Sequence, residues 1–164
     1  MVERLIDRLM RAIGVLLGAG FVAGVLLNLV NVAGRYGFGR SILGADEAQI
    51  FIMVWAAFLG AAVVTWRGEH LRMDILLQRA PAWWQRLSGR VEWAILALLS
   101  GFVVVQSSRF ILDMLAVDRR SEALGFPIAL AHAAVLCGFV LIGIVALLRL
   151  LNPAAGADRT GEPS

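Results

Sequence analysis

A long stretch without charge near the N-terminus limits what this chain can fold into. No charged side chain occurs in residues 12–34, although Arg4, Arg8 and Arg11 come just before them. The stretch is longer than the apolar core of a signal peptide, which has about 7–15 residues. It reaches the roughly 20 residues that a helix needs to cross a bilayer. The sequence therefore predicts an uncleaved first membrane-spanning helix, at about residues 13–34.

Three further apolar blocks follow, at about residues 48–66, 91–112 and 124–148. The chain is 60% hydrophobic, whereas soluble domains are about 45–50% apolar. Because lipid offers no hydrogen-bond partner, each single span must satisfy its own backbone as an α-helix. We predict an all-α integral membrane protein. Residues 1–152 would form one four-helix domain, and residues 153–164 a disordered cytoplasmic tail.

The arginines predict how the four helices are oriented. All fifteen basic residues are Arg, and ten of them fall at the two termini and in the connection between helices two and three. Basic residues accumulate on the cytoplasmic side of membrane proteins. Both termini are therefore expected in the cytoplasm, and the connections at about 35–47 and 113–123 on the outside.

The connection between helices two and three has a pattern of its own. Residues 71–77 mix apolar and charged side chains, and Pro81 suits the first turn of a helix. Trp83 and Trp84 follow, and tryptophan is enriched in the headgroup layer of a bilayer. One interpretation is a short helix in the cytoplasmic interface, a break at residues 80–81, and then helix three. The alternative is a solvated loop with incidental apolar residues.

Polar residues near the ends of the spans form one recognisable pattern. Asn28, Asn31 and Arg35 share a face of the first helix, and Arg35 is placed to pair with Asp46 or Glu47. This face should meet protein, because asparagine is costly in lipid. It is either a seam that fixes a helix contact or packing with no further role. No charge lies near the middle of a span, which argues against an ion pathway through this chain alone.

Small residues at four-residue spacing predict close packing between helices. The pairs are Gly14 and Gly18, Gly20 and Gly24, Ala56 and Gly60, and Ala57 and Ala61. The single cysteine, Cys137, has no disulfide or zinc-ligand partner and is expected to be a small packed residue.

Motifs for catalysis or cofactor binding are missing from the sequence. It has no phosphate loop, nucleophile elbow or metal-ligand spacing. His70 and His132 are expected on opposite sides of the membrane, so they predict no shared haem. The arginines flank the spans instead of forming a basic face for nucleic acid. We therefore predict no enzyme, no cofactor and no metal site. A self-sufficient four-helix transporter and a haem- or quinone-binding membrane anchor remain the alternative functions.

A set of spaced motifs resembles a known family. Residues 31–36 read Asn-Val-Ala-Gly-Arg-Tyr, acids precede the second block, Phe-Leu-Gly-Ala occupies residues 58–61, and His70 stands four positions before Asp74. This order, over about residues 10–150, resembles the small membrane subunit (DctQ or Q) of tripartite ATP-independent periplasmic (TRAP) transporters. The chain departs from the family where a Pro-x-Gly in helix four is replaced by Leu-Cys-Gly at residues 136–138.

The resemblance implies a division of labour among three proteins. A large DctM-like membrane subunit would carry the substrate and sodium sites, and a DctP-like periplasmic binding protein would deliver an organic acid such as a dicarboxylate. This chain would be a multi-pass protein of the bacterial inner membrane that enlarges the fixed scaffold of a solute–sodium symporter. Trp83 and Trp84 would anchor it in the lipid interface. The structural or interface candidates are then Asn28, Asn31, Arg35, Tyr36, Asp46, Glu47, Gly60, His70 and Asp74.

Overall fold

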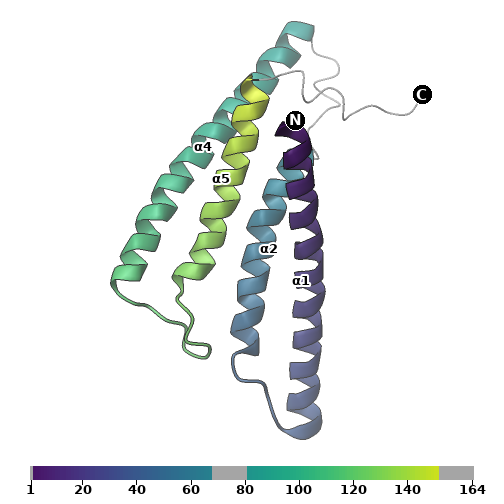
Figure 1. Ribbon diagram of the computed structural model, residues 1–164, viewed down its shortest axis with the longest axis vertical. Coiled ribbons are helices and arrows are strands. Elements are labelled where there is room, and N and C mark those ends of the chain that lie inside the picture. The colour runs from purple at the N-terminus through teal and green to yellow at the C-terminus, as the bar shows by residue number, and fades with distance from the viewer. Residues whose placement is uncertain (1, 68–80, 152–164) are drawn as a thin grey trace, which may run out of the picture.

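Four long helices make up the described part of the chain (Figure 1). The structure is a computed structural model that describes residues 2–67 and 81–151. Its helices are α1 (Val2–Phe38), α2 (Ala45–Arg67), α4 (Ala82–Ala116) and α5 (Ala129–Leu151). Each contains a stretch long and apolar enough to cross a membrane. The prediction of an all-α protein with four membrane-spanning helices is confirmed.

Three of the helices extend at both ends beyond the apolar blocks that predicted them. Instead of residues 13–34, α1 covers Val2–Phe38, and α2 adds residues at both ends of 48–66. Instead of 91–112, α4 runs unbroken over Ala82–Ala116. An apolar block marks only the part that lipid must surround, whereas the backbone hydrogen bonds of a helix continue into its polar ends.

The start of α4 can be compared with the break predicted at residues 80–81, before helix three. Pro81 lies immediately before the first helical residue, in an extended conformation with φ −61° and ψ 149°. Its missing N–H costs nothing there, because the first backbone donors of a helix have no partner within the helix. The interfacial helix predicted at residues 71–77 lies outside the described residues.

The fourth helix begins later than predicted. Residues 124–128 are apolar and are expected to be helical, but α5 starts at Ala129. Gly125 has a φ of +68°. Around it, the N–H of Ser121 donates to the Phe126 carbonyl (2.8 Å), and the N–H of Ile128 donates to the Arg119 carbonyl (3.1 Å). Apolar composition alone cannot distinguish such a turn from the first turn of a helix.

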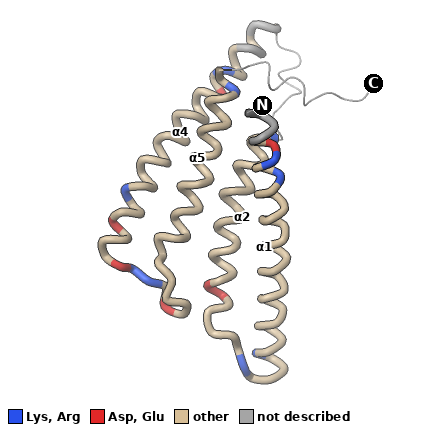
Figure 2. Tube along the Cα trace, in the orientation of Figure 1, with Lys and Arg blue, Asp and Glu red and all other residues tan. Residues whose placement is uncertain are grey.

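The helices follow the spatial order α1, α2, α5, α4 (Figure 1). The main contacts join α1 to α2, α2 to α5, and α4 to α5, so two hairpins meet along α2 and α5. We call the end with residues 39–44 and 117–128 the loop end, and the end with Val2 and Leu151 the terminal end. Charged residues of the described chain gather toward these two ends (Figure 2).

The best-packed region lies near the terminal end. Six buried residues cluster there: Met10, Val63, Trp66, Trp93, Val145 and Ala146. Elsewhere large apolar side chains face outward, and Leu98 and Phe102 are 74% and 69% exposed. Exposed apolar surface on this scale is suited to lipid or to a protein partner. Cys137 is also exposed, so the expectation that it is a packed residue is wrong.

Candidate functional site

Two asparagines tie α1 to α2 at the loop end. The side chain of Asn31 is buried; its Oδ1 accepts from the N–H of Ile42 (2.8 Å), and its Nδ2 donates to Oδ1 of Asp46 (3.3 Å). Near it, Nδ2 of Asn28 donates to Oε1 of Gln49 (2.6 Å). The Asn31 carboxamide therefore uses both its oxygen and its nitrogen within the protein, and the Asn28 carboxamide uses its nitrogen, which lowers the cost of placing these groups near lipid.

Arg35 completes this cluster through an ion pair. Its Nη2 lies 3.6 Å from Oδ2 of Asp46, and the two side chains are 54% and 71% exposed. An exposed ion pair contributes about 0–1 kcal/mol, so the buried Asn31 contacts hold this end of the hairpin more strongly. The structure thus brings Asn31, Arg35 and Asp46 together.

Glu47 turns away from this cluster to the other connection. Its carboxylate accepts from the Ser121 hydroxyl and from the backbone N–H groups of Ala123 (3.2 Å) and Leu124 (3.0 Å). Asp46, and not Glu47, pairs with Arg35. Glu47 instead fastens the start of α2 to the turn before α5, so one side chain joins the two hairpins at the loop end.

A Glu47→Ala substitution should loosen that turn. The Ser121 hydroxyl and the Ala123 N–H would lose their acceptor, and the Leu124 N–H would keep only its longer bond to Oγ of Ser121 (3.3 Å). The amides of Ala123 and Leu124 should therefore exchange with solvent deuterium faster. Hydrogen–deuterium exchange with mass spectrometry measures this directly. Glu122→Ala is the matched control, because that side chain is exposed and makes no hydrogen bond or ion pair with the described residues. Equal exchange in the two variants would show that Glu47 does not hold the turn.

The other candidates are spread over the described chain. Tyr36 is 84% exposed, and a Cβ at Gly60 would lie 4.0 Å from Leu17 Cδ1, which is ordinary packing. Trp84 is half exposed. His70 and Asp74 lie outside the described residues, as does the side chain of Trp83.

The glycine pairs of α1 are only partly used in packing against α2. A Cβ at Gly14 would lie near Val63, and one at Gly24 near Ile52, whereas Cβ atoms at Gly18 and Gly20 would meet nothing within 4 Å. The tightest approach between two described helices involves a glycine to which the sequence assigned no role, Gly138 of α5. A Cβ there would lie 2.8 Å from the carbonyl oxygen of Phe58 on α2.

A junction of all four helices at the terminal end is the main feature that sequence reasoning missed. We call Asp7, Trp66, Trp93 and Arg149 the terminal junction. Trp66 Nε1 donates to Oδ1 of Asp7 (2.7 Å), and Arg149 Nη2 donates to the Trp66 carbonyl (2.8 Å). The Arg149 guanidinium carbon lies 5.5 Å from the centre of the Trp93 ring. The junction therefore links α1 to α2, α2 to α5, and α5 to α4.

No sequence spacing indicates this junction. Asp7 and Trp66 are 59 positions apart, and Trp66 and Arg149 are 83 apart. Asp7, Trp66 and Arg149 lie near helix ends, where charged and aromatic side chains are common in any membrane protein, whereas Trp93 lies within the first third of α4. Their positions in the sequence only weakly indicate a structural role, and they do not indicate which residues these side chains contact.

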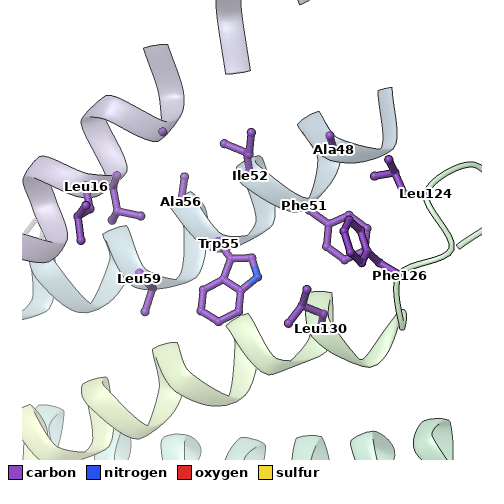
Figure 3. Close-up of a pocket in the computed structure, with 12 residues that line it drawn as sticks. Leu16, Ala48, Phe51, Ile52, Trp55, Ala56, Leu59, Leu124, Phe126 and Leu130 are labelled. Carbon is purple, nitrogen blue, oxygen red and sulfur yellow. The ribbon is translucent and has the colours of Figure 1, made fainter. Parts of the chain in front are cut away.

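An apolar groove runs along α2 between α1 and α5 (Figure 3). Its volume is about 450 Å³, and its lining includes Leu16 and Gly20 from α1, Ile52 and Trp55 from α2, and Leu130 from α5. The Trp55 indole reaches from α2 toward α5. Leu124 and Phe126 line the groove toward the loop end.

The described residues offer packing surfaces more clearly than they offer a chemical site. Among them, no three His, Cys, Asp or Glu side chains are placed to hold a metal ion. His132 packs against Phe110 with a centroid separation of 4.5 Å. The arrangement supplies hydrogen-bonded junctions at both ends of the bundle and an open groove between them.

Comparison with known proteins gives a consistent result. The family model for "Tripartite ATP-independent periplasmic transporters, DctQ component" matches residues 24–156. The chain is 28% identical over 139 residues to the ectoine TRAP transporter small permease protein TeaB of Halomonas elongata, covering 82% of this chain and 72% of that protein. It is 31% identical over 124 residues to the C4-dicarboxylate TRAP transporter small permease protein DctQ of Rhodobacter capsulatus, covering 76% and 53%.

A third relative is a longer protein. The chain is 27% identical over 114 residues to the isethionate TRAP transporter permease protein DctMQ of Oleidesulfovibrio alaskensis. The match covers 70% of this chain but 17% of that protein. Together with the four spanning helices, these matches show that the chain belongs to the DctQ family of TRAP transporter small membrane subunits and is a multi-pass protein of the bacterial inner membrane.

Proposed function

We propose that this chain is a scaffold subunit of a TRAP-type solute–sodium symporter and pairs with a large membrane subunit that carries the substrate and sodium sites. The observation that carries the proposal is the match to the DctQ family. The many apolar side chains that face outward from the four helices are consistent with it. A row in which α1 packs mainly on α2, and α4 mainly on α5, leaves long helix faces for another membrane protein.

The distribution of charge supports a scaffold role. An intramembrane site for an organic anion or a sodium ion is built from polar or ionisable groups at mid-depth. Here residues 12–34, 48–66, 93–108 and 123–148 carry no Asp, Glu or Arg. The charged groups of the described chain lie toward the two ends (Figure 2).

The relatives support a permanent partner and an organic solute. The protein named DctMQ carries a segment like this chain within a much longer permease, as expected if the small subunit functions next to a large one. C4-dicarboxylate and isethionate, which appear in two of the relatives' names, are organic anions. We propose an organic acid as the substrate class, delivered by a periplasmic binding protein.

Reconstitution tests the proposal. The chain is co-expressed with a candidate large TRAP permease from the same organism, the complex is purified through a tag on the small subunit, and uptake is measured in liposomes with an inward sodium gradient and a TRAP-type binding protein. We expect the two membrane chains to co-purify and uptake to require both of them. Uptake by this chain alone, or its failure to bind the permease, would refute the scaffold role.

A further inference from the structure

We propose that the groove along α2 receives a transmembrane helix of the large subunit, and that this helix presents a hydrogen-bond acceptor to the indole N–H of Trp55 near mid-membrane. The inference rests on the proposed function, because it assigns the place and the chemistry of the subunit contact.

Trp55 places a hydrogen-bond donor deep in the membrane. It belongs to the 23-residue helix α2, which starts at Ala45. At a rise of 1.5 Å per residue, Trp55 lies about 15 Å from that end. The hydrocarbon core of a bilayer is about 30 Å thick. The indole therefore sits near the middle of the hydrocarbon layer.

The donor has no acceptor among the described residues. The Trp55 indole makes no hydrogen bond with the described residues, in contrast to Trp66, whose indole N–H donates to Asp7. In Figure 3 the indole nitrogen lies on the side of the ring that faces Leu130, across an apolar lining. Indole N–H groups are normally paired when they are buried.

The bilayer cannot supply the missing acceptor. The hydrocarbon core holds no water that could bind a polar group. Acyl chains carry no acceptor at mid-depth, since their ester groups lie at the interface about 15 Å away. A protein helix can supply one, as a Ser or Thr hydroxyl, an Asn or Gln carboxamide oxygen, or a backbone carbonyl freed at a break in the helix.

The shape of the groove also suits a helix. Gly20, Ala48 and Ala56 are among its lining residues, and small residues let two helix backbones approach closely. Gly20 is not used inside this chain, because a Cβ there would meet nothing within 4 Å. The larger lining residues Leu16 and Phe126 are 70% and 52% exposed, so apolar surface remains for a partner to cover.

The occupant is expected to be the large subunit because a related permease contains a segment like this chain within its own length. Such a chain keeps the two membrane parts next to each other at all times. A lipid molecule or a second copy of this chain are the other possible occupants, and the tests below separate them.

Cross-linking locates the partner. A photoreactive p-benzoylphenylalanine is placed at Leu16 or Leu59 in the groove, and at Leu98 on α4 as an outward-facing comparison, in the co-expressed complex. We expect both groove positions to cross-link to the large subunit, and more strongly than Leu98. If the two chains co-purify but the groove positions give only lipid adducts or small-subunit dimers, this inference fails and the proposed function stands. If the chains do not co-purify, the proposed function itself fails.

Filling the groove tests whether it is used for docking. Gly20→Leu would project into the groove, whereas Gly18→Leu occupies equally open space on the same helix, outside the groove lining. We expect Gly20→Leu to reduce recovery of the complex at least about 10-fold and Gly18→Leu to leave it near wild type. The thermal stability of the isolated chain should be the same in both variants. Equal recovery of the complex in the two variants would overturn the proposal.

A nearly isosteric replacement tests the hydrogen bond. Trp55 is replaced by benzothienylalanine, which keeps the ring shape and has sulfur in place of the N–H. Loss of one interhelical hydrogen bond should weaken association of the two subunits by about 3- to 30-fold. The same replacement at Trp84, which is half exposed at the start of α4, should leave association unchanged. Unchanged association of the Trp55 variant would overturn the assignment of an acceptor on the partner helix.

Discussion

A Gly138→Ala substitution is expected to destabilise the fold strongly, because the added methyl group would clash with the backbone of α2. The added Cβ would lie 2.8 Å from both the Cβ and the carbonyl oxygen of Phe58, and 3.0 Å from its carbonyl carbon. Two of these three atoms belong to the backbone of α2, which cannot rotate away as the tip of a side chain can. The contact between α2 and α5 would have to open, and overpacking of this kind costs about 1–3 kcal/mol.

The contact matters because it is where the two hairpins meet. Among the described helices, no other pair with main contacts joins the α1–α2 hairpin to the α4–α5 hairpin. Alanine has the better helix propensity by about 1 kcal/mol, so any loss of stability must come from the clash. The experiment compares thermal unfolding of Gly138→Ala and wild type in the same detergent.

Gly101→Ala is the control for this substitution. It lies within α4, where a Cβ would meet nothing within 4 Å, so its stability should match or slightly exceed that of wild type. An unfolding midpoint for Gly138→Ala equal to that of Gly101→Ala would show that the two helices are not in such close contact.

Arg149→Ala should give the second large effect, at the terminal junction. Arg149 Nη2 donates to the carbonyl of Trp66 (2.8 Å), in the last turn of α2. Carbonyls in that turn have no partner within the helix. A hydrogen bond from a charged donor contributes about 1.5–3 kcal/mol. The guanidinium carbon also lies 5.5 Å and 6.0 Å from the ring centres of Trp93 and Trp66, close enough for cation–π attraction.

The matched control for Arg149 is Arg90→Ala. Arg90 lies on α4, is exposed, and its side chain makes no hydrogen bond or ion pair with the described residues. Arg149→Lys should be intermediate, since an ammonium keeps the charge but cannot donate and stack as a planar guanidinium does. Thermal unfolding followed by tryptophan fluorescence reports on the junction, because two of its members are tryptophans. Equal midpoints for the Arg149→Ala and Arg90→Ala variants would contradict this assignment.

Local sequence determined the membrane class, the number of spans and the polar pattern at the end of α1. A bilayer demands a long apolar run in each span and an internally bonded backbone, and both requirements act within one segment. The grouping of Asn31 and Arg35 also follows from helical spacing alone. The start of the fourth span was placed too early, because residues 124–128 are as apolar as a helix but form a turn around Gly125.

Only the tertiary structure decided which segments meet. Asp46 and Glu47 are neighbours in sequence, yet one holds the first connection and the other the turn before α5. The terminal junction, the close approach at Gly138 and the groove beside Trp55 all join residues from different helices. Within lipid, apolar side chains gain little by leaving one apolar surface for another. Helix pairing therefore depends on steric fit and on a few hydrogen bonds between distant residues, neither of which is visible in hydropathy.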